Sequence, residues 1–590
     1  MKKKNILVGL CCSLLLSACS LDYENTEAIT PDAVWKDPKM INAFLNDIYG
    51  NMMPGWPITA NNTDEGMNGT TEMSQYVRGE ATVMNSGVGL DYKNIDKINF
   101  FLDNLEATTA LTEDEKKPLI GQALFWRAWA YWDKVFQVGG VPLILKTQDV
   151  SDINSLILPR NSTTECVTQI LADLDEAIAS LPDTWENEDY GRIDKGCAMA
   201  FKGRVLLQYA SPLFNPNNDQ KRWQDAYEAN KAAVDFLQSV GKGLYEGNFA
   251  DIWYDEQNKE VIMVNQYYYP DHALDQKNIR PLTLTKDMAD QNQAIFPLFM
   301  AFPKLDGTPL ELDLDRLATD EVYNKQFVDE FYTNRDPRFH ATIFCPGTEY
   351  PCDNILVNGM KYWNGWKMQD DNYVTLITDA YGGGCNYGSN FYQRKGLDDL
   401  TTTEVYNGET DWIEIRFAEV LMNKGEAANE IGKNSEALQV LYDIRKRAGI
   451  QSTDGKYGIM AANQSEIREA YMKERYIEFA YENKRWADLR RWKRFDILND
   501  LKYRSSLYLV IKDYSIVETG NFDWTKDMFD PEVRKLFRFD YIECVDGDKD
   551  IYKFNLDLNH WFYPIKKDDL DRNSKLEQNN EWGGTFDPLK

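Results

Sequence analysis

Hydrophobic residues recur three and four positions apart in two long parts of the chain, and this spacing predicts amphipathic helices. In the first part, which extends to about residue 240, the pattern predicts helices over residues 119–138, 164–181, 195–209 and 223–240. Turn residues follow the first three: Gly139-Gly140, Pro182 and Pro212. In the second part, the pattern predicts a hairpin of two helices over residues 415–431 and 435–448, separated by Gly432.

Small residues in the first helix of this hairpin, Ala418, Gly425 and Ala428, share a side with its larger apolar residues. Small side chains at a crossing point let two helices pack closely. Helix pairs of this size resemble tetratricopeptide-type units of about 34 residues. We therefore predict a mainly α fold, in which a tetratricopeptide-like scaffold of helical hairpins carries a large, irregular, loop-rich insertion.

The insertion is predicted at residues 245–410, where proline and glycine break every helical pattern, as in Asp336-Pro337-Arg338 and Gly382-Gly383-Gly384. Long irregular segments in compact proteins are usually functional or disordered, and the aromatic density here argues against disorder. No long Pro/Ser-rich linker divides the chain, so we expect one elaborated unit over residues 19–590. Its predicted parts are residues 19–244 (N-terminal helices), 245–410 (insertion), 411–500 (C-terminal hairpins) and 501–590 (irregular C-terminal region).

The first nineteen residues indicate a lipid anchor. Three lysines (residues 2–4) precede an apolar run from Ile6 to Leu16, and Leu16-Ser17-Ala18-Cys19 follows. This is the pattern of a bacterial lipoprotein signal peptide, residues 1–18, whose removal leaves an acylated Cys19. Palmitate-type acyl chains would hold the protein at a membrane. The apolar run is too short for a membrane-spanning helix, and an ordinary secretory signal is the alternative.

The composition indicates a folded, strongly acidic protein. Residues 1–18 carry three of the 65 basic residues and no acidic one, so residues 19–590 hold 62 basic and 94 acidic residues, a formal charge of −32. This charge disfavours nucleic acid and anionic membrane faces as partners. Hydrophobic residues make up 43% of the chain, which is ample for a large core.

Cysteine and metal-type patterns are weak. Cys345 and Cys352 flank a Pro-Gly turn and could form a local disulfide, or they could remain buried thiols. Asp546, Asp548 and Asp550 begin like a calcium loop, but Ile551 stands where the loop requires glycine. We expect no cofactor, with a structural calcium ion as the alternative.

No catalytic motif stands out. The chain has three histidines and lacks HExxH, GxSxG and GxxxxGK[ST] patterns. Carboxylate pairs suitable for glycoside hydrolysis arise by chance among 94 acidic residues, and none is singled out. We therefore expect a protein that is not an enzyme.

Several segments, taken in order, resemble the SusD/RagB family of surface nutrient-binding lipoproteins. After the lipobox and a predicted helix at residues 40–49, they are Thr63-Asp64-Glu65, Arg127-Ala128-Trp129, Gly139-Gly140-Val141-Pro142-Leu143, Gly203-Arg204-Val205, Asp336-Pro337-Arg338, Gln393-Arg394-Lys395, Arg416-Phe417-Ala418-Glu419, Glu474-Arg475, Glu478-Phe479-Ala480, Lys484-Arg485-Trp486 and Tyr563-Pro564-Ile565. The match spans nearly the whole chain.

The resemblance implies a scaffold of four tetratricopeptide-like hairpins and a ligand-binding lobe made by the middle region and an N-terminal loop. It also implies a partner, a SusC-like TonB-dependent transporter of the outer membrane, to which such proteins deliver a captured glycan or, alternatively, a peptide. Two further functions stay open, a surface glycoside hydrolase and a lid without affinity of its own. Asp22 and Glu24 resemble an export signal that would place the chain on the extracellular side of the outer membrane.

One departure concerns starch. Relatives that bind starch place a tryptophan shortly before the second long helix, where this chain has Ser86-Gly87-Val88-Gly89-Leu90. The resemblance therefore does not extend to the aromatic arc of those relatives.

Sugars present hydroxyl groups and weakly polar C–H faces, so a glycan site needs flat aromatic side chains and strong hydrogen-bonding groups. Each aromatic candidate could equally pack in the core; Trp56, Trp363 and Trp366 are favoured because turns tend to expose side chains. Asp64, Glu65, Arg78 and Asn85 could bind hydroxyls, and the first two could equally brace their loop. The aromatic candidates are Trp56, Tyr76, Tyr268, Tyr269, Phe296, Trp363, Trp366, Tyr373 and Tyr381.

The basic, aromatic segment 484–494 is expected to serve the fold. Trp486, Leu489 and Trp492 recur three positions apart, which predicts a core stripe on one helical face. Arg490 and Arg491 are expected to pair with carboxylates such as Glu478 or Glu482.

Overall fold

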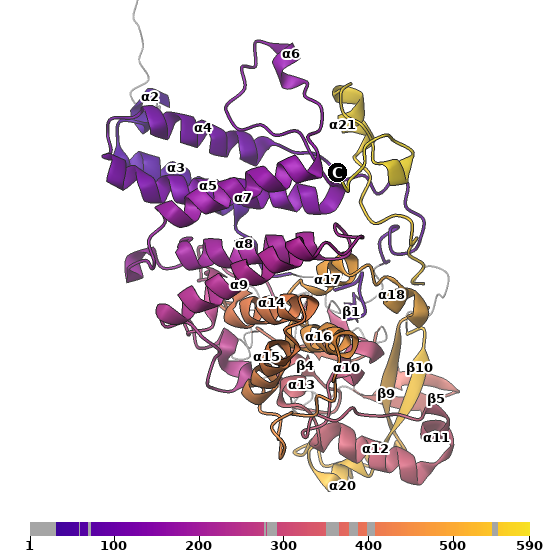
Figure 1. The fold of residues 1–590 in the computed structure, drawn as a ribbon. Coiled ribbons are helices and arrows are strands. Elements are labelled where there is room, and N and C mark those ends of the chain that lie inside the picture. The colour runs from indigo at the N-terminus through magenta and orange to yellow at the C-terminus, as the bar shows by residue number, and fades with distance from the viewer. Residues whose placement is uncertain are drawn as a thin grey trace, which may run out of the picture.

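The computed structural model describes residues 31–57, 60–68, 72–276, 279, 292–349, 365–376, 388–397, 407–545 and 553–590. Pairs of helices stack along the molecule, and Figure 1 shows the N-terminal pairs at one end and the C-terminal pairs beside them. The pairs are α3 (Pro38–Met52) with α4 (Lys93–Ala107), α5 (Glu113–Val138) with α7 (Thr163–Ser180), α8 (Lys195–Ala210) with α9 (Gln220–Ser239), and α14 (Phe417–Glu430) with α15 (Asn434–Arg447). The predicted mainly α, tetratricopeptide-like scaffold is confirmed.

The stack is continuous because helices of neighbouring pairs also touch. Helix α9 packs on α14, and α16 (Gln464–Glu478) packs on both α14 and α15. Gly425 lies at this crossing, where an added Cβ would collide with the Tyr471 hydroxyl and approach Val440. A small residue is therefore required at the crossing, as the sequence pattern predicts.

Several helix boundaries differ from the prediction, and two of them have a clear physical reason. Helix α5 starts six residues before the predicted Leu119, because Thr112 and Glu115 form a reciprocal capping box and Pro118 is tolerated inside the helix. The predicted helix start at Ile415 is wrong. Residues Trp412–Arg416 form strand β8, paired antiparallel with β2 (Val261–Asn265), and all five residues are buried.

The expectation that turns break every helical pattern between residues 245 and 410 is also wrong. Among the residues that the structure describes there, this region holds four α-helices, of which α12 is the longest, and one 3-10 helix (Phe249–Trp253). Asp320 caps α12 by accepting hydrogen bonds from the backbone N–H groups of Val322 and Tyr323. The α-helices are α10 (Phe296–Ala301), α11 (Leu314–Thr319), α12 (Glu321–Thr333) and α13 (Pro337–Thr342).

Two small sheets connect this region with distant parts of the chain. In the first, with order β1-β3-β7-β4, Gly66 of the N-terminal loop pairs with Ala294. In the second, with order β10-β9-β5-β6, the two long strands come from the C-terminal region, and Phe539 faces Leu509. The strands are β1 (Gly66–Met67), β3 (Gln293–Ala294), β4 (Ile343–Phe344), β5 (Trp366–Gln369), β6 (Asn372–Thr375), β7 (Tyr392–Gln393), β9 (Ser505–Ile511) and β10 (Phe537–Glu543).

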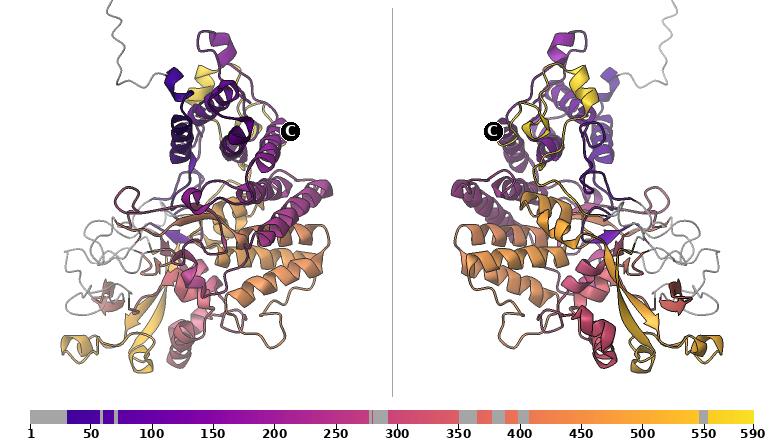
Figure 2. Two further views of the ribbon diagram at one scale, coloured as in Figure 1. Left: turned by 90° about the vertical axis from the view of Figure 1, so that its left-hand side faces the viewer. Right: turned by 90° about the vertical axis from the view of Figure 1, so that its right-hand side faces the viewer.

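These sheets and helices α10–α13 form a lobe with its own hydrophobic core. Phe331, for example, packs against Phe339, Phe391 and Phe539, which come from three separate segments. Figure 2 shows the lobe strands projecting to one side of the helical stack.

The remaining α-helices are short: α2 (Pro31–Val34), α6 (Ile153–Leu156), α17 (Arg485–Arg491), α18 (Asp496–Leu501), α19 (Ser515–Glu518), α20 (Pro531–Arg534) and α21 (Lys567–Arg572).

A buried ion network joins the lobe to the scaffold. Arg338 of the lobe contacts Glu474 and Glu478 of α16 at 2.7 and 2.8 Å, and Arg416 contacts Glu478 at 2.6 Å and Glu482 at 2.7 Å. Among the described residues, the network holds five cations and five carboxylates: Arg338, Lys395, Arg416, Arg445 and Arg447 with Glu260, Asp336, Glu474, Glu478 and Glu482.

The balance of charge keeps this network ionised. Burial alone would raise the pKa of the Glu478 carboxyl, but Arg447, Arg416 and Arg338 outweigh burial and hold that pKa well below its ordinary value of 4.5. Several motifs that the sequence shares with the SusD/RagB pattern thus contribute to the junction between scaffold and lobe.

The predicted pairing with carboxylates holds for Arg491 but not for Arg490, and Glu478 and Glu482 are not the partners because they belong to this network. Arg491 pairs instead with Glu426 at 2.7 Å and Asp488 at 2.8 Å. Arg490 donates to backbone carbonyls, among them that of Trp561 at 2.7 Å. Both side chains are buried, as expected of fold residues.

The predicted signal peptide and Cys19 lie outside the described residues. Within the part of the chain that the structure describes, every helix is too short or too polar to cross a bilayer.

Candidate functional site

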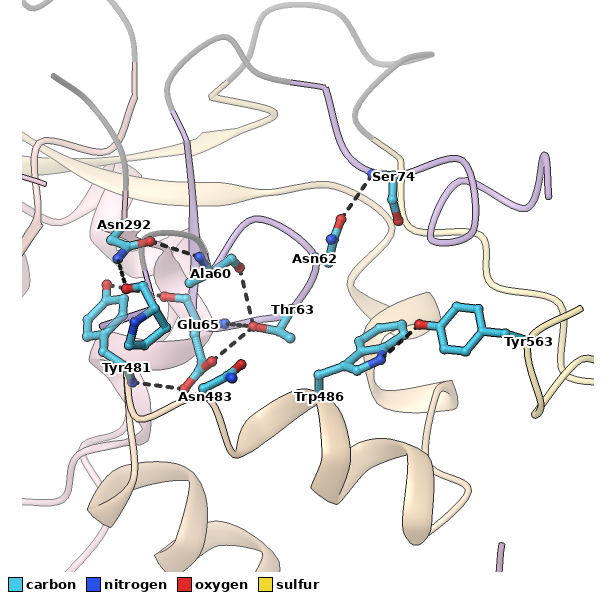
Figure 3. A pocket seen from close by; sticks show the side chains of 11 residues that line it. Ala60, Asn62, Thr63, Glu65, Ser74, Asn292, Tyr481, Asn483, Trp486 and Tyr563 are labelled. Atoms are coloured by element: carbon cyan, nitrogen blue, oxygen red, sulfur yellow. Dashed lines mark hydrogen bonds between the residues drawn. The ribbon is translucent and has the colours of Figure 1, made fainter. Parts of the chain in front are cut away.

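A pocket of about 300 Å³ lies where the N-terminal loop meets the turn after α16 and the C-terminal segment. Figure 3 shows side chains from these three parts and Asn292, which precedes strand β3, around the pocket. The lining residues are Pro57, Ala60, Asn62, Thr63, Glu65, Ser74, Asn292, Tyr481, Asn483, Trp486 and Tyr563.

A buried ion pair holds the N-terminal loop, which includes residues 60–68, in place. Both carboxylate oxygens of Asp64 accept hydrogen bonds from Arg485, at 2.8 and 2.6 Å. The hydroxyl of Tyr476 donates to the carbonyl of Asp64 at 2.6 Å. Asp64 therefore braces the loop, which is the structural role that the sequence left open.

Asn292 holds the other side of the loop. Its Oδ1 accepts from the Ala60 N–H at 2.8 Å, and its Nδ2 donates to Gln393 Oε1 at 2.7 Å. The N-terminal loop is thereby tied to the edge of the lobe, and the pocket is formed without a ligand. A preformed, partly apolar pocket with a few placed polar groups is typical of small-ligand sites.

Glu65 is the acidic group of the pocket. It is 4% exposed, and its carboxylate accepts from the Tyr481 N–H at 3.1 Å and from the Thr63 hydroxyl at 3.3 Å. Burial raises the pKa of Glu65 to about 7, although the Tyr481 N–H opposes this, and the charge of Asp64 raises the pKa further. Below about pH 7 the side chain is therefore mostly protonated and can donate a hydrogen bond.

Glu65→Gln is expected to remove a pH dependence of stability. Because the folded pKa of about 7 lies above the ordinary 4.5, the folded wild type binds more protons than the unfolded chain between these values. Wild-type stability therefore falls as pH rises from 4.5 to 7, by up to about 3 kcal/mol. Urea unfolding at several pH values should show a smaller decrease in the variant; equal decreases would contradict the assignment.

Aromatic side chains form the opposite wall. The half-buried Trp486 donates from Nε1 to the Tyr563 hydroxyl at 3.1 Å. It stacks on Phe495 with ring centroids 5.0 Å apart, and Phe495 stacks on Trp561 at 4.6 Å. Tyr76 packs edge-on against Trp486 at 6.0 Å. The indole is therefore held rigidly while part of it lines the pocket.

This arrangement suits a polyhydroxylated ligand with apolar faces. A fixed indole and phenol ring offer a flat surface for C–H groups. Around them stand amides, hydroxyls and one acid, which can donate to or accept from sugar hydroxyls. Glu65 carries the one carboxyl group among the lining residues of the pocket.

The structure places few of the predicted ligand residues in this pocket. Glu65 lines it, while Asp64 and Tyr76 lie directly behind its walls. Arg78 forms ion pairs with Glu72 and Glu80 at 3.1 and 2.9 Å. The exposed Asn85 closes a local turn by accepting from the Thr82 N–H at 2.7 Å.

Two favoured tryptophans are buried, so the expectation that turns expose them is wrong. Trp56 is 7% exposed, donates to the Thr410 carbonyl at 2.8 Å and packs against Trp412. Its ring fills the space beside Gly396, where an added Cβ would collide with it. Trp366 is 2% exposed and stacks on Tyr508 at 4.2 Å, because its segment forms strand β5.

The other aromatic candidates are dispersed. Tyr268 and Tyr269 are each 54% exposed on a bend. Phe296 packs edge-on against Tyr541 at the start of α10, and Tyr373 lines a different cavity. Trp363 and Tyr381 lie outside the described residues.

Sequence reasoning missed most of the pocket. The core stripe predicted for Trp486, Leu489 and Trp492 holds for the last two, which are buried, but Trp486 also borders the pocket. Tyr563 belongs to a segment that carries the family resemblance, and Ser74 and Asn483 carry no motif. The turn after α16 brings Tyr481 and Asn483 to the pocket with positive φ angles of 62° and 57°. Asparagine is enriched at such angles, so Asn483 is the lining residue whose turn position the sequence could have indicated.

Within the described residues, no group of three or more His, Cys, Asp or Glu side chains is arranged to hold a metal ion. The calcium-like residues Asp546, Asp548 and Asp550 lie outside that range, as does Cys352, the proposed disulfide partner of the buried Cys345. The calcium ion and this disulfide stay predictions.

Comparison with known families gives two matches. Residues 293–582 match the SusD family model, and residues 42–207 match a model described as starch-binding associating with outer membrane. The chain is 24% identical to SusD-like protein P25 of Formosa agariphila over 420 residues, 70% of this chain and 71% of the relative. It is 24% identical to SusD-like protein P2 of the same organism over 84% of this chain and 91% of the relative.

Solved structures share the fold. A SusD-like protein from Bacteroides fragilis superposes with a TM-score of 0.69 at 23% identity, covering 93% of this chain and 98% of that protein. A SusD-like carbohydrate binding protein from the same species gives 0.67 at 18% identity, covering 92% and 99%. Surface glycan-binding protein A from Bacteroides uniformis gives 0.55 at 18% identity, covering 92% and 100%.

Proposed function

This chain belongs to the SusD/RagB family, and from that membership we propose that it captures an oligosaccharide at the cell surface and passes it to a SusC-like TonB-dependent transporter. The protein binds its ligand without cleaving it. Its lipid anchor is the acylated Cys19, which holds it to the outer membrane with the folded part on the extracellular side.

The observation that carries this proposal is the pocket between the N-terminal loop and Trp486. It combines a rigid aromatic wall with the acid Glu65 and several amides and hydroxyls, which is the chemistry that sugar rings require. The names of two relatives of the same fold, a carbohydrate binding protein and a surface glycan-binding protein, support a glycan as the ligand class.

The proposed location has separate support. One matched family model is described as associating with outer membrane. The sequence supplies the lipobox Leu16-Ser17-Ala18-Cys19, with acidic residues Asp22 and Glu24 shortly after it. A lipid anchor near the N-terminus leaves the whole folded unit free to meet a transporter.

A screen of the soluble chain from Ser20 onward tests the function. We expect saturable binding to at least one family of oligosaccharides on a glycan array and in calorimetry, without release of reducing sugar. Product release would show a glycoside hydrolase instead. If no glycan binds and peptides do, the ligand of this protein is a peptide.

The transporter partnership is tested on the native protein. Gentle detergent extraction from its own membrane should yield a complex with a larger barrel protein. Isolation of the chain alone under conditions that preserve other membrane complexes would contradict the partnership.

A further inference from the structure

A second cavity, of about 750 Å³, lies in the lobe between helices α11 and α12 and the edge of strand β10. It shares no lining residue with the pocket beside Trp486. Figure 1 places α11, α12 and β10 at the end of the molecule opposite α3–α7. Its volume falls within the range of about 300–1,000 Å³ that is typical of ligand sites.

One side chain holds the walls of this cavity together by hydrogen bonding to the backbone of strand β10, as a neighbouring strand would. β10 is an edge strand, and the buried Asn324 of α12 donates to the Phe539 carbonyl at 2.7 Å and accepts from the Phe539 N–H at 3.0 Å. The same amide donates to the Leu317 carbonyl of α11 at 2.8 Å. Because one amide holds α11, α12 and β10 together, the cavity is formed before any ligand arrives.

A preorganised carboxylate stands in the cavity wall. Asp540 accepts from Arg538 Nε at 2.8 Å and Nη2 at 3.0 Å, and from the Tyr373 hydroxyl at 2.9 Å. Its side chain remains 20% exposed, and that of Arg538 41% exposed. Burial and the neighbouring Asp540 raise the pKa of Tyr373 to about 12, so its hydroxyl keeps the proton that it donates.

The Asp540–Arg538 pair has hydrogen-bonding capacity left for a ligand. A carboxylate offers about four acceptor positions and a guanidinium five N–H groups, and the contacts just described use three and two of them. An acceptor and a donor held side by side match two adjacent hydroxyl groups of a sugar, each of which can donate and accept.

Apolar surface adjoins these polar groups. Tyr373 and Tyr541 line the cavity, and Tyr541 is held edge-on by Phe296 at 5.2 Å. Leu314 at the start of α11 lines it too and is 39% exposed. The pocket beside Trp486 likewise combines aromatic rings with a carboxyl group, although the residues differ.

The charges of the lining favour a neutral ligand. Lys512 and Arg538 are balanced by Glu321 and Asp540. A phosphate or polyanionic ligand would meet two carboxylates, and a cationic one would meet two basic groups. An uncharged chain of sugars avoids both conflicts.

We propose that the cavity between α11, α12 and β10 is a second carbohydrate site, which binds a neutral oligosaccharide through Tyr373, Tyr541 and the Asp540–Arg538 pair. The inference rests on the proposed glycan-binding function and extends it. A glycan long enough to have two free segments could be held at two places on one chain, which raises the effective concentration of the second segment.

Calorimetry with neutral hexasaccharides tests this site. Maltohexaose, cellohexaose, xylohexaose and mannohexaose are titrated separately into the soluble chain from Ser20 onward, its Tyr373→Ala variant and its Ala318→Trp variant. Ala318 is exposed and lines the cavity, so the added indole fills the space without removing a buried contact. Tyr442→Ala, a half-buried tyrosine of α15 that lines neither site, is the matched control.

We expect one or more of these sugars to occupy two sites on the wild type. Both cavity variants should weaken one site by at least about tenfold, while Tyr442→Ala leaves both unchanged. Trp486→Ala should affect the other site only. If the cavity variants bind every probe as the wild type does while Trp486→Ala loses binding, the second site is refuted and the proposed function stands. If no probe binds to any form, the second site for neutral oligosaccharides is refuted, and the glycan array decides the proposed function separately.

Discussion

Trp486→Ala is expected to weaken oligosaccharide binding at the pocket of the N-terminal loop by about 30-fold or more. Fully packed aromatic side chains at the centre of a binding site commonly contribute about 2 kcal/mol or more. Trp486 is anchored by Phe495 and by its hydrogen bond to Tyr563, so its ring does not have to be ordered when the ligand arrives. Calorimetric titration of both forms with the best glycan from the array measures the difference.

Two further variants separate binding from stability. Ser74→Trp places an indole at an exposed position of the pocket wall and should also reduce binding, without loss of a packed side chain. Trp524→Ala removes a half-buried tryptophan that lines neither cavity, and binding should stay within about twofold of wild type. If both Trp486→Ala and Ser74→Trp bind the glycan with wild-type affinity, the pocket is not the glycan-binding site.

Arg416→Met is expected to lower the free energy of unfolding by about 3–5 kcal/mol. Arg416 is 1% exposed and contacts Glu260 at 2.7 Å, Glu478 at 2.6 Å and Glu482 at 2.7 Å. Methionine fills a similar volume but leaves these carboxylates short of one positive charge. Removing one member of a buried ion network is costly for that reason. Urea unfolding followed by circular dichroism gives the change.

An exposed ion pair provides the matched control. Lys231 and Asp235 lie one helical turn apart on α9, with side chains 49% and 56% exposed. Lys231→Met should change stability by no more than about 0.5 kcal/mol, because exposed pairs contribute little. A similarly small effect of Arg416→Met would show that the network does not hold the lobe on the scaffold.

The scaffold is predictable because its helices carry local signals. The helices predicted at residues 164–181 and 195–209 agree to within one residue with α7 and α8, where apolar periodicity and turn residues coincide. Strand β8 escapes prediction because its partner β2 lies about 150 residues earlier, and periodicity contains no information on distant pairing. Helix α12 is not predicted for a related reason. Prolines and glycines on both sides suggest a loop, and the thirteen-residue helix is stabilised by packing its apolar face on the distant strand β10.

The pocket is less predictable than the fold. Asp64 and Glu65 are neighbours in sequence, yet Asp64 points into an ion pair with Arg485 while Glu65 lines the pocket. Trp56 has the turn residues that favour exposure, but a cluster containing Trp412 buries it. Whether an aromatic residue in a loop is exposed depends on which distant segment covers it, and the local sequence does not carry that information.

The motifs that carry the family resemblance have a physical role in the fold. Asp336, Arg338, Lys395, Arg416 and Glu478 come from four separate motifs of the sequence, and the structure brings all five residues into one network. Buried charges tolerate few substitutions because each change leaves a partner uncompensated. The segments that identify the fold are therefore largely those that hold it together.

The central claim is that a sugar ring is bound between Trp486 and Glu65. A crystal structure of the soluble chain with its best oligosaccharide tests this most directly. We expect a sugar ring packed against the indole of Trp486, with a hydroxyl within hydrogen-bonding distance of the Glu65 carboxyl. Oligosaccharide density confined to other parts of the surface, with the pocket occupied by water alone, would contradict the account.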